Sequence, residues 1–467
     1  MKSLEITINQ EKKSYDYWLK KNWYYHQYIA KLYAFFIPKN KIVLQINCKN
    51  GFLLSKVTPK IGIGVDDDVQ CITEAQQTHC NYQFFSTSIN DISGAQKFDY
   101  IILSSAIMET DDVQMLFESL HRFCHASTRI VLDFYSFGWE PILWLTQKLK
   151  LRRATPLKNW LSRIDVKNFL HLAGFETIRH ESHMLIPYYI PFVTGFINTY
   201  IASLPFINSL CLTQWLVARP LQSIQTNQQY SVSVIIPCKN ERGNIEPAVQ
   251  RCPVMGKFTE IIFVEGNSKD NTLEEIKRVQ QAYPEKNIRY FVQDGKGKGN
   301  AVHLGFAQAQ GDILMIQDAD LTAPPEELPK FYNALAERKG EFINGSRLVY
   351  GMESEAMRPL NLFANYCFGL GFSWLLGQPI KDTLCGTKVL FKKDYENIWH
   401  NRSFFGNFDP FGDFDLLFGA AKQNLKIIDM PVHYKNRTYG STQISRFRNG
   451  FALLCMWLVA FRKFKLR

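Results

Sequence analysis

The sequence contains no pair of cysteines spaced as C-x-x-C, although it has ten cysteines in 467 residues. The cysteines lie singly between Cys48 and Cys455. This distribution excludes a zinc ribbon and a disulfide framework, and it favours a reducing cytoplasm. The N-terminal stretch MKSLEITINQEKKSYDYW has no apolar run, so we expect no secretory signal.

The sequence also lacks a clean apolar run of the length that crosses a bilayer, about 20 residues. Three uncharged stretches come nearest: Met184–Ala218 is broken by prolines, Leu360–Ile380 holds glycines, and Gly450–Phe461 is too short. The last is framed by basic residues, namely Arg446, Arg448, Arg462, Lys463, Lys465 and Arg467. An apolar helix in a basic frame suits an anionic membrane surface, whereas a buried helix or a subunit contact is the alternative for all three.

The balance of charge is basic, with a formal net charge of +11. This charge fits an anionic partner such as a nucleotide, a phospholipid surface or a nucleic acid. The sequence has no RNP, zinc or basic-helix motif, so we expect no nucleic acid. A hydrophobic content of 46% and a length of 467 residues predict a globular chain of two or three domains.

Strand and helix patterns alternate along both halves of the chain. The N-terminal series is KIVLQIN, IGIGVD, YQFFST, FDYIILSS and RIVLDFY, and the C-terminal series is VSVIIP, EIIFVEG, IRYFVQD and DILMIQD. This alternation predicts two doubly wound α/β domains with mainly parallel sheets. The predicted segments are an N-terminal helical extension (1–40), a first domain (41–220), a linker (221–230), a second domain (231–445) and a C-terminal helix (446–467).

Each predicted strand of the C-terminal half delivers polar groups to one edge of the sheet. These are Pro237, Lys239, Asn240 and Glu241 after the first strand, Glu265, Asn267, Ser268 and Asp270 after the second, Lys296 and Lys298 after the third, and Asp318 and Asp320 after the fourth. Ligands of open α/β sheets bind outside the carboxyl ends of the strands. Thr272 and Glu275 are placed to form a capping box that opens the next helix.

The stretch ILMIQDADL ends an apolar strand on two carboxylates one residue apart, Asp318 and Asp320. Mg²⁺ and Mn²⁺ prefer such oxygen ligands together with substrate phosphates, whereas a solvated turn is the plainer alternative. The stretch Gly295–Gly299, GKGKG, lets backbone N–H groups approach an anion or forms a basic turn. It does not have the pattern of a Walker loop.

At this point the sequence resembles a family. SVIIPCKNE, VEGNSKDNT, GKGKGNAVHLGF and DADLTAPPEEL are similar, in this order, to the motifs of family 2 glycosyltransferases with the GT-A fold. The resemblance is to the dolichyl-phosphate mannose synthase-like, or polyprenyl-phosphate glycosyltransferase, branch. It continues through INGSRLVYG, IKDTLCGTKVLF, FGDFDLLFGAAK and NRTYGSTQISRFRNG, and so covers the chain from about Ser231 to its end.

The resemblance implies a role for individual residues. These are Pro237, Asn240 and Glu241 at the nucleotide base, Glu265 and Asp270 at base or ribose, Lys298 at the diphosphate, Asp318 and Asp320 as metal ligands, Arg347 and Arg437 at phosphate groups, and Asp382, Asp413 and Asp415 on the acceptor side. Two positions depart from the family pattern. Gly266 stands where a second acid is usual, which loosens the ribose assignment, and Gln443 stands where a lysine is often found, which weakens a lipid-phosphate assignment.

The implied reaction is an inverting transfer from a nucleotide-diphosphate sugar with Mg²⁺ or Mn²⁺. A cation and a lysine would stabilise the charge that develops on the leaving diphosphate. A hydroxyl acceptor, as in a glycan, needs a base such as Asp413 or Asp415, whereas a polyprenyl phosphate is already ionised. The alternative for these two acids is pairing with a helix dipole. We expect a cytoplasmic enzyme of cell envelope glycan synthesis, peripheral at the inner membrane face.

The N-terminal half resembles class I methyltransferases through KIVLQINCKNGFLLSKV and GIGVDDDV. The resemblance implies S-adenosylmethionine binding by Gly51 of the loop and by Asp66, the acid that would hold the ribose. However, Gln45 replaces an acid, and Asn47 and Lys49 replace glycines. These side chains would crowd the methionine end of the cofactor, so we predict weak or absent binding and a retained scaffold or docking domain.

Two other interpretations stay open from the sequence. One is a bifunctional enzyme that also methylates a glycan or lipid, and the other is a non-catalytic scaffold associated with the membrane. The degenerate loop argues against the first, and the two carboxylates Asp318 and Asp320 argue against the second.

Overall fold

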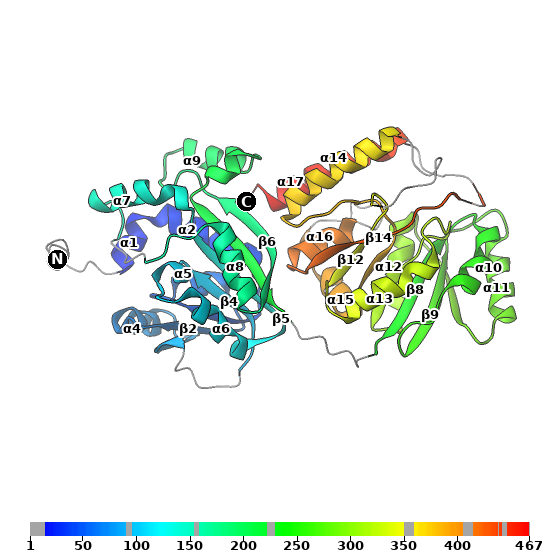
Figure 1. Ribbon diagram of the computed structural model, residues 1–467, viewed down its shortest axis with the longest axis horizontal. Coiled ribbons are helices and arrows are strands. Elements are labelled where there is room, and N and C mark those ends of the chain that lie inside the picture. Colours follow the sequence, from blue (N-terminus) through cyan, green and yellow to red (C-terminus); the bar gives the residue numbers. More distant parts are fainter. Residues whose placement is uncertain are drawn as a thin grey trace. The chain divides into compact units, whose positions relative to one another are not determined.

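The computed structural model describes residues 15–89, 96–153, 158–221, 229–349, 359–404, 414–437, 439–440 and 446–466. It divides into two compact units, Met1–Leu221 and Gln222–Arg467. Each unit is built on one seven-stranded, mostly parallel sheet that is flanked by helices (Figure 1). The prediction of two doubly wound α/β domains with mainly parallel sheets is confirmed.

The sheet of the N-terminal unit has the order β3-β2-β1-β4-β5-β7-β6, in which β7 runs antiparallel to both of its neighbours. The strands are β1 (Ile42–Ile46), β2 (Ile61–Asp66), β3 (Gln83–Ser86), β4 (Phe98–Ser104), β5 (Cys124–Tyr135), β6 (Phe175–His183) and β7 (Thr213–Pro220). The helices are α1 (Tyr15–Lys21), α2 (Trp23–Phe36), α3 (Phe52–Val57), α4 (Val69–Thr78), α5 (Ala106–Glu109), α6 (Val113–Ser119), α7 (Glu140–Lys148), α8 (Arg163–Leu172) and α9 (Val193–Phe196).

The sheet of the C-terminal unit has the order β10-β9-β8-β11-β13-β12-β14, with β13 antiparallel to β11 and β12. The strands are β8 (Ser231–Cys238), β9 (Phe258–Glu265), β10 (Asn287–Val292), β11 (Ile313–Ile316), β12 (Phe342–Ser346), β13 (Lys388–Phe391) and β14 (Ile427–Pro431). The helices are α10 (Arg242–Arg251), α11 (Thr272–Ala282), α12 (Lys298–Gln308), α13 (Leu328–Ala336), α14 (Pro359–Leu376), α15 (Lys392–His400), α16 (Phe414–Lys422) and α17 (Arg446–Phe464).

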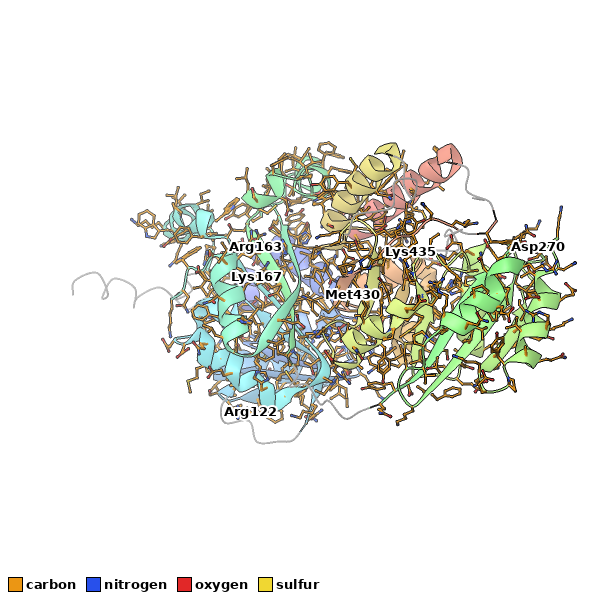
Figure 2. All side chains as sticks on the ribbon, turned by 45° about the vertical axis from the view of Figure 1, so that its right-hand side comes forward. Arg122, Arg163, Lys167, Asp270, Met430 and Lys435 are labelled. Atoms are coloured by element: carbon orange, nitrogen blue, oxygen red, sulfur yellow. The ribbon has the colours of Figure 1, made fainter. Side chains whose placement is uncertain are left out.

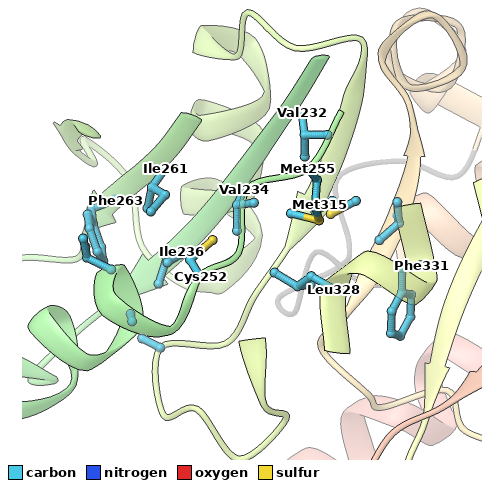
Figure 3. Packing of buried hydrophobic residues seen from close by; sticks show 14 of the residues in the cluster. Val232, Val234, Ile236, Cys252, Met255, Ile261, Phe263, Met315, Leu328 and Phe331 are labelled. Carbon is cyan, nitrogen blue, oxygen red and sulfur yellow. The ribbon is translucent and has the colours of Figure 1, made fainter. Parts of the chain in front are cut away.

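The central strands of the C-terminal unit are apolar on both faces because helices cover both faces. Val232, Val234 and Ile236 of β8 pack with Ile261 and Phe263 of β9 in one buried cluster (Figure 3). In each unit the strand order reverses between the first and the fourth strand, at β1/β4 and at β8/β11. Such a reversal leaves a crevice at the carboxyl ends of the strands, which is where ligands bind in this class of fold.

The uncharged stretches of the sequence form different elements of structure. Met184–Ala218 is not a single buried helix, because its last residues form β7. Helices α14 and α17 pack against each other, with the rings of Trp374 and Trp457 6.1 Å apart. Within the part of the chain that the structure describes, no helix has both the length and the hydropathy of a membrane span.

Candidate functional site

The loops after β8 and β9 are bound to each other by hydrogen bonds at the crevice. The Asn240 backbone N–H donates to the Ser268 hydroxyl at 2.9 Å, and the Asn240 side-chain oxygen accepts from the Lys269 N–H at 2.8 Å. Asn240 and Asn267 both adopt a left-handed backbone conformation, which asparagine tolerates better than most residues. The sequence therefore builds a fixed rim from the two loops in which the base-binding residues were predicted.

Asp270 and Thr272 join this rim, whereas the sequence predicted a capping box of Thr272 with Glu275 at the start of α11. The Thr272 hydroxyl donates to the Asp270 carboxylate and accepts from the Glu241 N–H at 3.1 Å. The Arg242 N–H donates to Asp270 at 3.2 Å. The capping box with Glu275 is wrong, because Thr272 is already the first helical residue and Asn271 precedes the helix without a side-chain cap. Figure 2 shows Asp270 and Lys435 below α14 and α17, the yellow and red helices of the C-terminal unit.

Glu265 and Pro237 lie on the same rim at the ends of their strands. Glu265 is buried, and its carboxylate accepts from the Ser268 N–H at 2.5 Å. Pro237 is half-buried within β8. The structure thus brings together the residues that were predicted to line base and ribose, with the acidic side chain of Glu265 fixed by its own loop.

Lys298 and Asp318 form an ion pair across the crevice. Lys298 is the first residue of α12, directly after Gly297, whose positive φ of 89° suits a glycine. The ammonium group of Lys298 lies 2.7 Å from Oδ1 of Asp318, and about 30% of each side chain is exposed (29% and 32%). Burial would raise the pKa of Asp318, but Lys298 outweighs it and holds the pKa below its ordinary value. The carboxylate is therefore ionised and open to solvent.

Asp320 is paired with Arg437, which comes from the segment after β14. The Lys435 N–H donates to the Thr322 carbonyl at 2.9 Å, and this bond brings the segment back to the crevice. The Arg437 guanidinium donates to Asp320 at 2.7 Å and to Glu241 at 3.2 Å. Asp320 also accepts from the Thr322 N–H and hydroxyl at 3.1 and 2.8 Å. A predicted metal ligand and a predicted base-side residue thus share one guanidinium.

Arg347 and Asp382 form a buried bidentate pair. Two nitrogens of the Arg347 guanidinium lie 2.7 and 2.9 Å from the two carboxylate oxygens, and the Asp382 side chain has 0% exposure. Burial raises the pKa of Asp382, but the guanidinium outweighs burial, so the pKa lies below its ordinary value. Both oxygens of Asp382 hold Arg347, so Asp382 positions that arginine. Its catalytic role on the acceptor side stays a prediction.

Asp415 lies near the start of α16, next to His303 of α12, with 3.9 Å between the His303 Nε2 and an Asp415 carboxylate oxygen. Burial, reinforced by Arg402, lowers the pKa of His303 to about 4, so this imidazole is neutral at pH 7. The sequence analysis missed His303, although it lies within the GKGKGNAVHLGF motif. Asp413 and Gln443 lie outside the described residues.

The donor atoms at the end of β11 fit a divalent cation that is completed by substrate phosphates. Asp318 and Asp320 contribute ionic oxygens at the switch point, and the described residues include no cluster of three or more His, Cys, Asp or Glu side chains. Mg²⁺ and Mn²⁺ sites of this kind use one or two carboxylates and not a full protein cage. A side chain at Gly386 would collide with Asp318, since a Cβ there would lie 1.9 Å from its oxygen, so the glycine leaves room for the carboxylate.

At the corresponding edge of the N-terminal unit, Lys49 is paired with the strand-end carboxylate Asp66. The Lys49 N–H donates to Asp66 at 2.8 Å, and its ammonium lies 3.0 Å from Glu109 and 3.8 Å from Asp66. The other oxygen of Asp66 accepts from the Asp68 N–H at 3.0 Å. Gly51 has a φ of 75°, and a Cβ there would lie 2.6 Å from the Phe84 ring. The sequence predicted that Lys49 crowds the cofactor, but not its pairing with Glu109.

A cavity of about 430 Å³ lies beside this lysine, within the N-terminal unit. Its walls come from the loop after β1, the end of β4, helices α1, α2 and α7, and the segment from Leu185 to Tyr188. The lining combines aromatic, aliphatic and polar side chains, with Lys49, Arg152 and Arg153 as its lysine and arginine residues. Burial lowers the pKa of the lining residue His26 to about 4, so it is neutral.

Comparison with family models divides the chain in the same way. Residues 233–401 match the model described as Glycosyl transferase family 2, and residues 26–190 match the model described as Methionine biosynthesis protein MetW.

Curated relatives match the C-terminal part. A dolichol-phosphate mannosyltransferase of Pyrococcus furiosus is 40% identical over 126 residues, which are 27% of this chain and 35% of that protein. One of Saccharomyces cerevisiae is 38% identical over 126 residues, which are 26% of this chain and 46% of that protein. The match therefore spans less than half of each relative. Glucosyl-3-phosphoglycerate synthase of Mycobacterium tuberculosis is a similar solved structure, with a TM-score of 0.38 and 16% identity over 50% of this chain and 80% of that one.

Proposed function

We propose that this chain, which carries a family 2 glycosyltransferase domain in its C-terminal unit and a methyltransferase-like domain in its N-terminal unit, is a metal-dependent inverting glycosyltransferase. Its donor is a nucleotide-diphosphate sugar, and its acceptor is a polyprenyl-phosphate-type lipid or a glycan. The observation that carries the proposal is the pairing of two strand-end carboxylates with two cations, Asp318 with Lys298 and Asp320 with Arg437.

These pairs balance the charge of the crevice before the donor arrives. A diphosphate competes for Lys298 and Arg437, because phosphate oxygens accept hydrogen bonds from both kinds of cation. Asp318 and Asp320 would then hold the divalent ion, which neutralises charge on the leaving diphosphate. Lys298 contributes to the same stabilisation from the start of α12, where the helix dipole adds to it.

On the acceptor side, Asp415 and Asp413 are the proposed bases for a hydroxyl acceptor. A phosphate acceptor needs no base, because its second pKa is about 6 and it is ionised at pH 7. We favour the phosphate acceptor because both dolichol-phosphate mannosyltransferases match this part of the chain. Because His303 is neutral at pH 7, its imidazole places no positive charge beside the Asp415 carboxylate.

We further propose that the enzyme works at the inner membrane face. Helix α17 buries Leu453, Met456 and Ala460 in its own unit but exposes Leu454 and Leu458. An exposed apolar stripe next to basic residues fits an anionic bilayer surface. Because α17 is partly a core helix, its deletion would disturb folding. The better variant is Leu454→Ser/Leu458→Ser, which should weaken vesicle flotation while leaving the melting temperature unchanged.

The decisive experiment is a panel of nucleotide sugars scored for hydrolysis and for transfer, with and without Mg²⁺ or Mn²⁺. We expect turnover of at least one donor that requires the cation, and transfer to a short-chain polyprenyl phosphate. Efficient transfer to a soluble sugar with none to the polyprenyl phosphate would reject the lipid acceptor. Turnover that persists in a chelator would reject metal dependence.

A further inference from the structure

The segment from Tyr188 to Leu210 presents its apolar residues to solvent and its polar residues to the protein. We call its exposed side chains the aromatic surface; they are Tyr188, Tyr189, Ile190, Phe192, Val193, Phe196, Tyr200, Leu204, Phe206 and Leu210. Phe192 is 96% exposed and Phe206 is 93% exposed, whereas Thr194 and Asn198 are buried (0% and 4% exposed). This polarity is the reverse of that of a segment that faces water.

Two matching turns expose the phenylalanines. In Pro191-Phe192-Val193 the Val193 N–H donates to the Pro191 carbonyl at 2.7 Å, and in Pro205-Phe206-Ile207 the Ile207 N–H donates to the Pro205 carbonyl at 2.9 Å. Each bond closes a three-residue γ-turn with a phenylalanine at its centre. The φ angles of Phe192 and Phe206 are 63° and 69°, a conformation that costs a bulky residue free energy. Strained and fully exposed aromatic residues at two places indicate a role outside the fold.

The segment is held in place by its buried polar side chains. The Asn198 side-chain oxygen accepts from the N–H groups of Leu185 and Ile186 at 2.8 and 3.0 Å, and its amide donates to the Ile186 carbonyl at 2.7 Å. The Thr194 hydroxyl donates to the Tyr188 carbonyl at 2.9 Å. The exposed rings therefore project from a fixed framework.

Helix α7 extends the same surface; it carries Glu140 and Lys148, and the basic residues Lys150, Arg152 and Arg153 follow it. Its exposed side chains include Trp144 and Leu145, and the Lys148 ammonium lies 3.6 Å from the centre of the Trp144 ring. The Trp139 indole N–H donates to the Leu210 carbonyl at 2.8 Å and joins the two regions. Both views show α7 and α9 at the upper end of the N-terminal unit (Figures 1 and 2). Met184–Ala218 contains no charged residue, so the surface has no acid of its own to repel an anion.

We propose that the aromatic surface and α7 dock the N-terminal unit onto an anionic lipid bilayer, with Phe192 and Phe206 inserted among the acyl chains. Aromatic residues with flanking lysines are typical of protein surfaces at the lipid–water interface. A protein partner would leave the charge bias and the two projecting rings unexplained. The inference does not depend on the glycosyltransferase reaction, because every residue in it lies in the N-terminal unit.

The test is flotation of the full chain with vesicles of phosphatidylcholine and phosphatidylglycerol. The variant is Phe192→Gly/Phe206→Gly, because glycine removes both rings and suits the positive φ, so the fold should not suffer. We expect an affinity loss of about tenfold for each ring, since burial of one phenylalanine is worth at least that factor. The matched control is Ile164→Gly/Val254→Gly, which removes two side chains exposed to 77% and 75% elsewhere and should bind as the parent does.

A second variant, Phe192→Trp/Phe206→Trp, should retain binding and show an indole emission that shifts to the blue on addition of vesicles. Equal vesicle affinity of the glycine variant and the parent would overturn the proposal. It would also be overturned if the parent ignores vesicles and forms a dimer that the glycine substitutions dissolve, which would assign the surface to a second copy of the chain. Donor binding measured without vesicles should be the same in all variants, which separates this test from that of the enzyme activity.

Discussion

Each unit places a carboxylate at a strand end beside a lysine, and the two pairs differ in access. In the N-terminal unit, the Lys49 ammonium and the Asp66 carboxylate are 3.8 Å apart, and the Asp66 side chain has 0% exposure. In the C-terminal unit, Lys298 and Asp318 are 2.7 Å apart, and 32% of the Asp318 side chain is exposed. The Asp66 carboxylate is buried and bonded to groups of its own unit, whereas the Asp318 carboxylate remains accessible to a ligand.

The origin of each lysine explains this difference. Lys49 lies inside the loop after β1, so both its N–H and its side chain reach Asp66, and Glu109 holds the ammonium from the other side. Lys298 follows a glycine loop and starts a helix, so it contacts Asp318 only by its ammonium end. A lysine therefore occupies the strand-end carboxylate in the N-terminal crevice, whereas in the C-terminal crevice a lysine pairs with a carboxylate that stays accessible.

The buried acids of the two units also respond to pH in opposite directions. Burial dominates at Asp133 of β5 and raises its pKa to about 6. At Asp382, Arg347 outweighs burial and lowers the pKa. Asp133 therefore stabilises the fold at low pH and loses this contribution as pH rises through about 6, whereas Asp382 contributes at neutral pH and loses its contribution in acid.

The largest expected effect comes from Arg347→Met. Removal of the guanidinium leaves the buried Asp382 charge uncompensated, which costs about 3–5 kcal/mol of unfolding free energy. Denaturant unfolding monitored at pH 7 measures this loss. The double variant Arg347→Met/Asp382→Leu should recover most of it. A single variant as stable as the parent would contradict the assignment of Asp382 as the partner of Arg347.

The second largest expected effect is a loss of turnover in the variant Lys298→Met. Loss of one preorganised charge at the leaving group lowers kcat about 100-fold or more. Because Lys298 is partly exposed, the melting temperature should change little. The matched control is Lys296→Met, an exposed lysine of the same loop, whose kcat should stay within about twofold of the parent value. If kcat falls equally in both variants, the positive charge of the loop matters and Lys298 has no specific role at the leaving group.

A smaller effect is expected for Asp133→Asn. The pKa of Asp133 lies about two units above that of a free aspartate, so the fold loses up to about 3 kcal/mol as pH rises from 4 to above 6. The variant should be more stable than the parent at pH 8 and equal to it near pH 4. The control Asp67→Asn, at an exposed site, should show no such pH dependence. Unfolding curves at the two pH values decide the matter.

The smallest effect is expected for Lys49→Ala in the N-terminal unit. Removal of the ammonium frees Asp66 and Glu109, so S-adenosylmethionine affinity should rise about tenfold from a weak starting value. Equilibrium dialysis with labelled cofactor measures it. If the parent binds at a micromolar dissociation constant, about −8 kcal/mol, the comparison between the two crevices fails.

Much of the fold could be predicted from the sequence because its strands are unambiguous. Continuous apolar runs such as VSVIIP and DILMIQD became β8 and β11, and their order gave the crevice. Strand β7 was hidden, because Thr213–Pro220 continues an apolar stretch without a break. Its antiparallel place between β5 and β6 depends on pairing that is remote in sequence.

The site was predictable in its residue types but not in its pairings. The sequence placed Asp318, Asp320 and Lys298 at one edge, because each follows a strand. It could not show that the guanidinium of Arg437, 117 positions after Asp320, contacts both Asp320 and Glu241. Nor could it show that Asp382 is buried against Arg347. The exposure of Phe192 and Phe206 was equally hidden, because a sequence does not show which side of a γ-turn faces solvent.

The central claim is that the C-terminal crevice binds a nucleotide diphosphate through a cation held by Asp318 and Asp320, whereas Asp66 in the N-terminal crevice is already paired with Lys49. Calorimetry with the donor identified in the panel, with and without Mn²⁺, tests it most directly. We predict cation-dependent donor binding that is lost in Asp320→Ala and retained in Glu274→Ala, a substitution of an exposed acid on α11. S-adenosylmethionine should give no micromolar binding. Unchanged donor affinity in Asp320→Ala would contradict it.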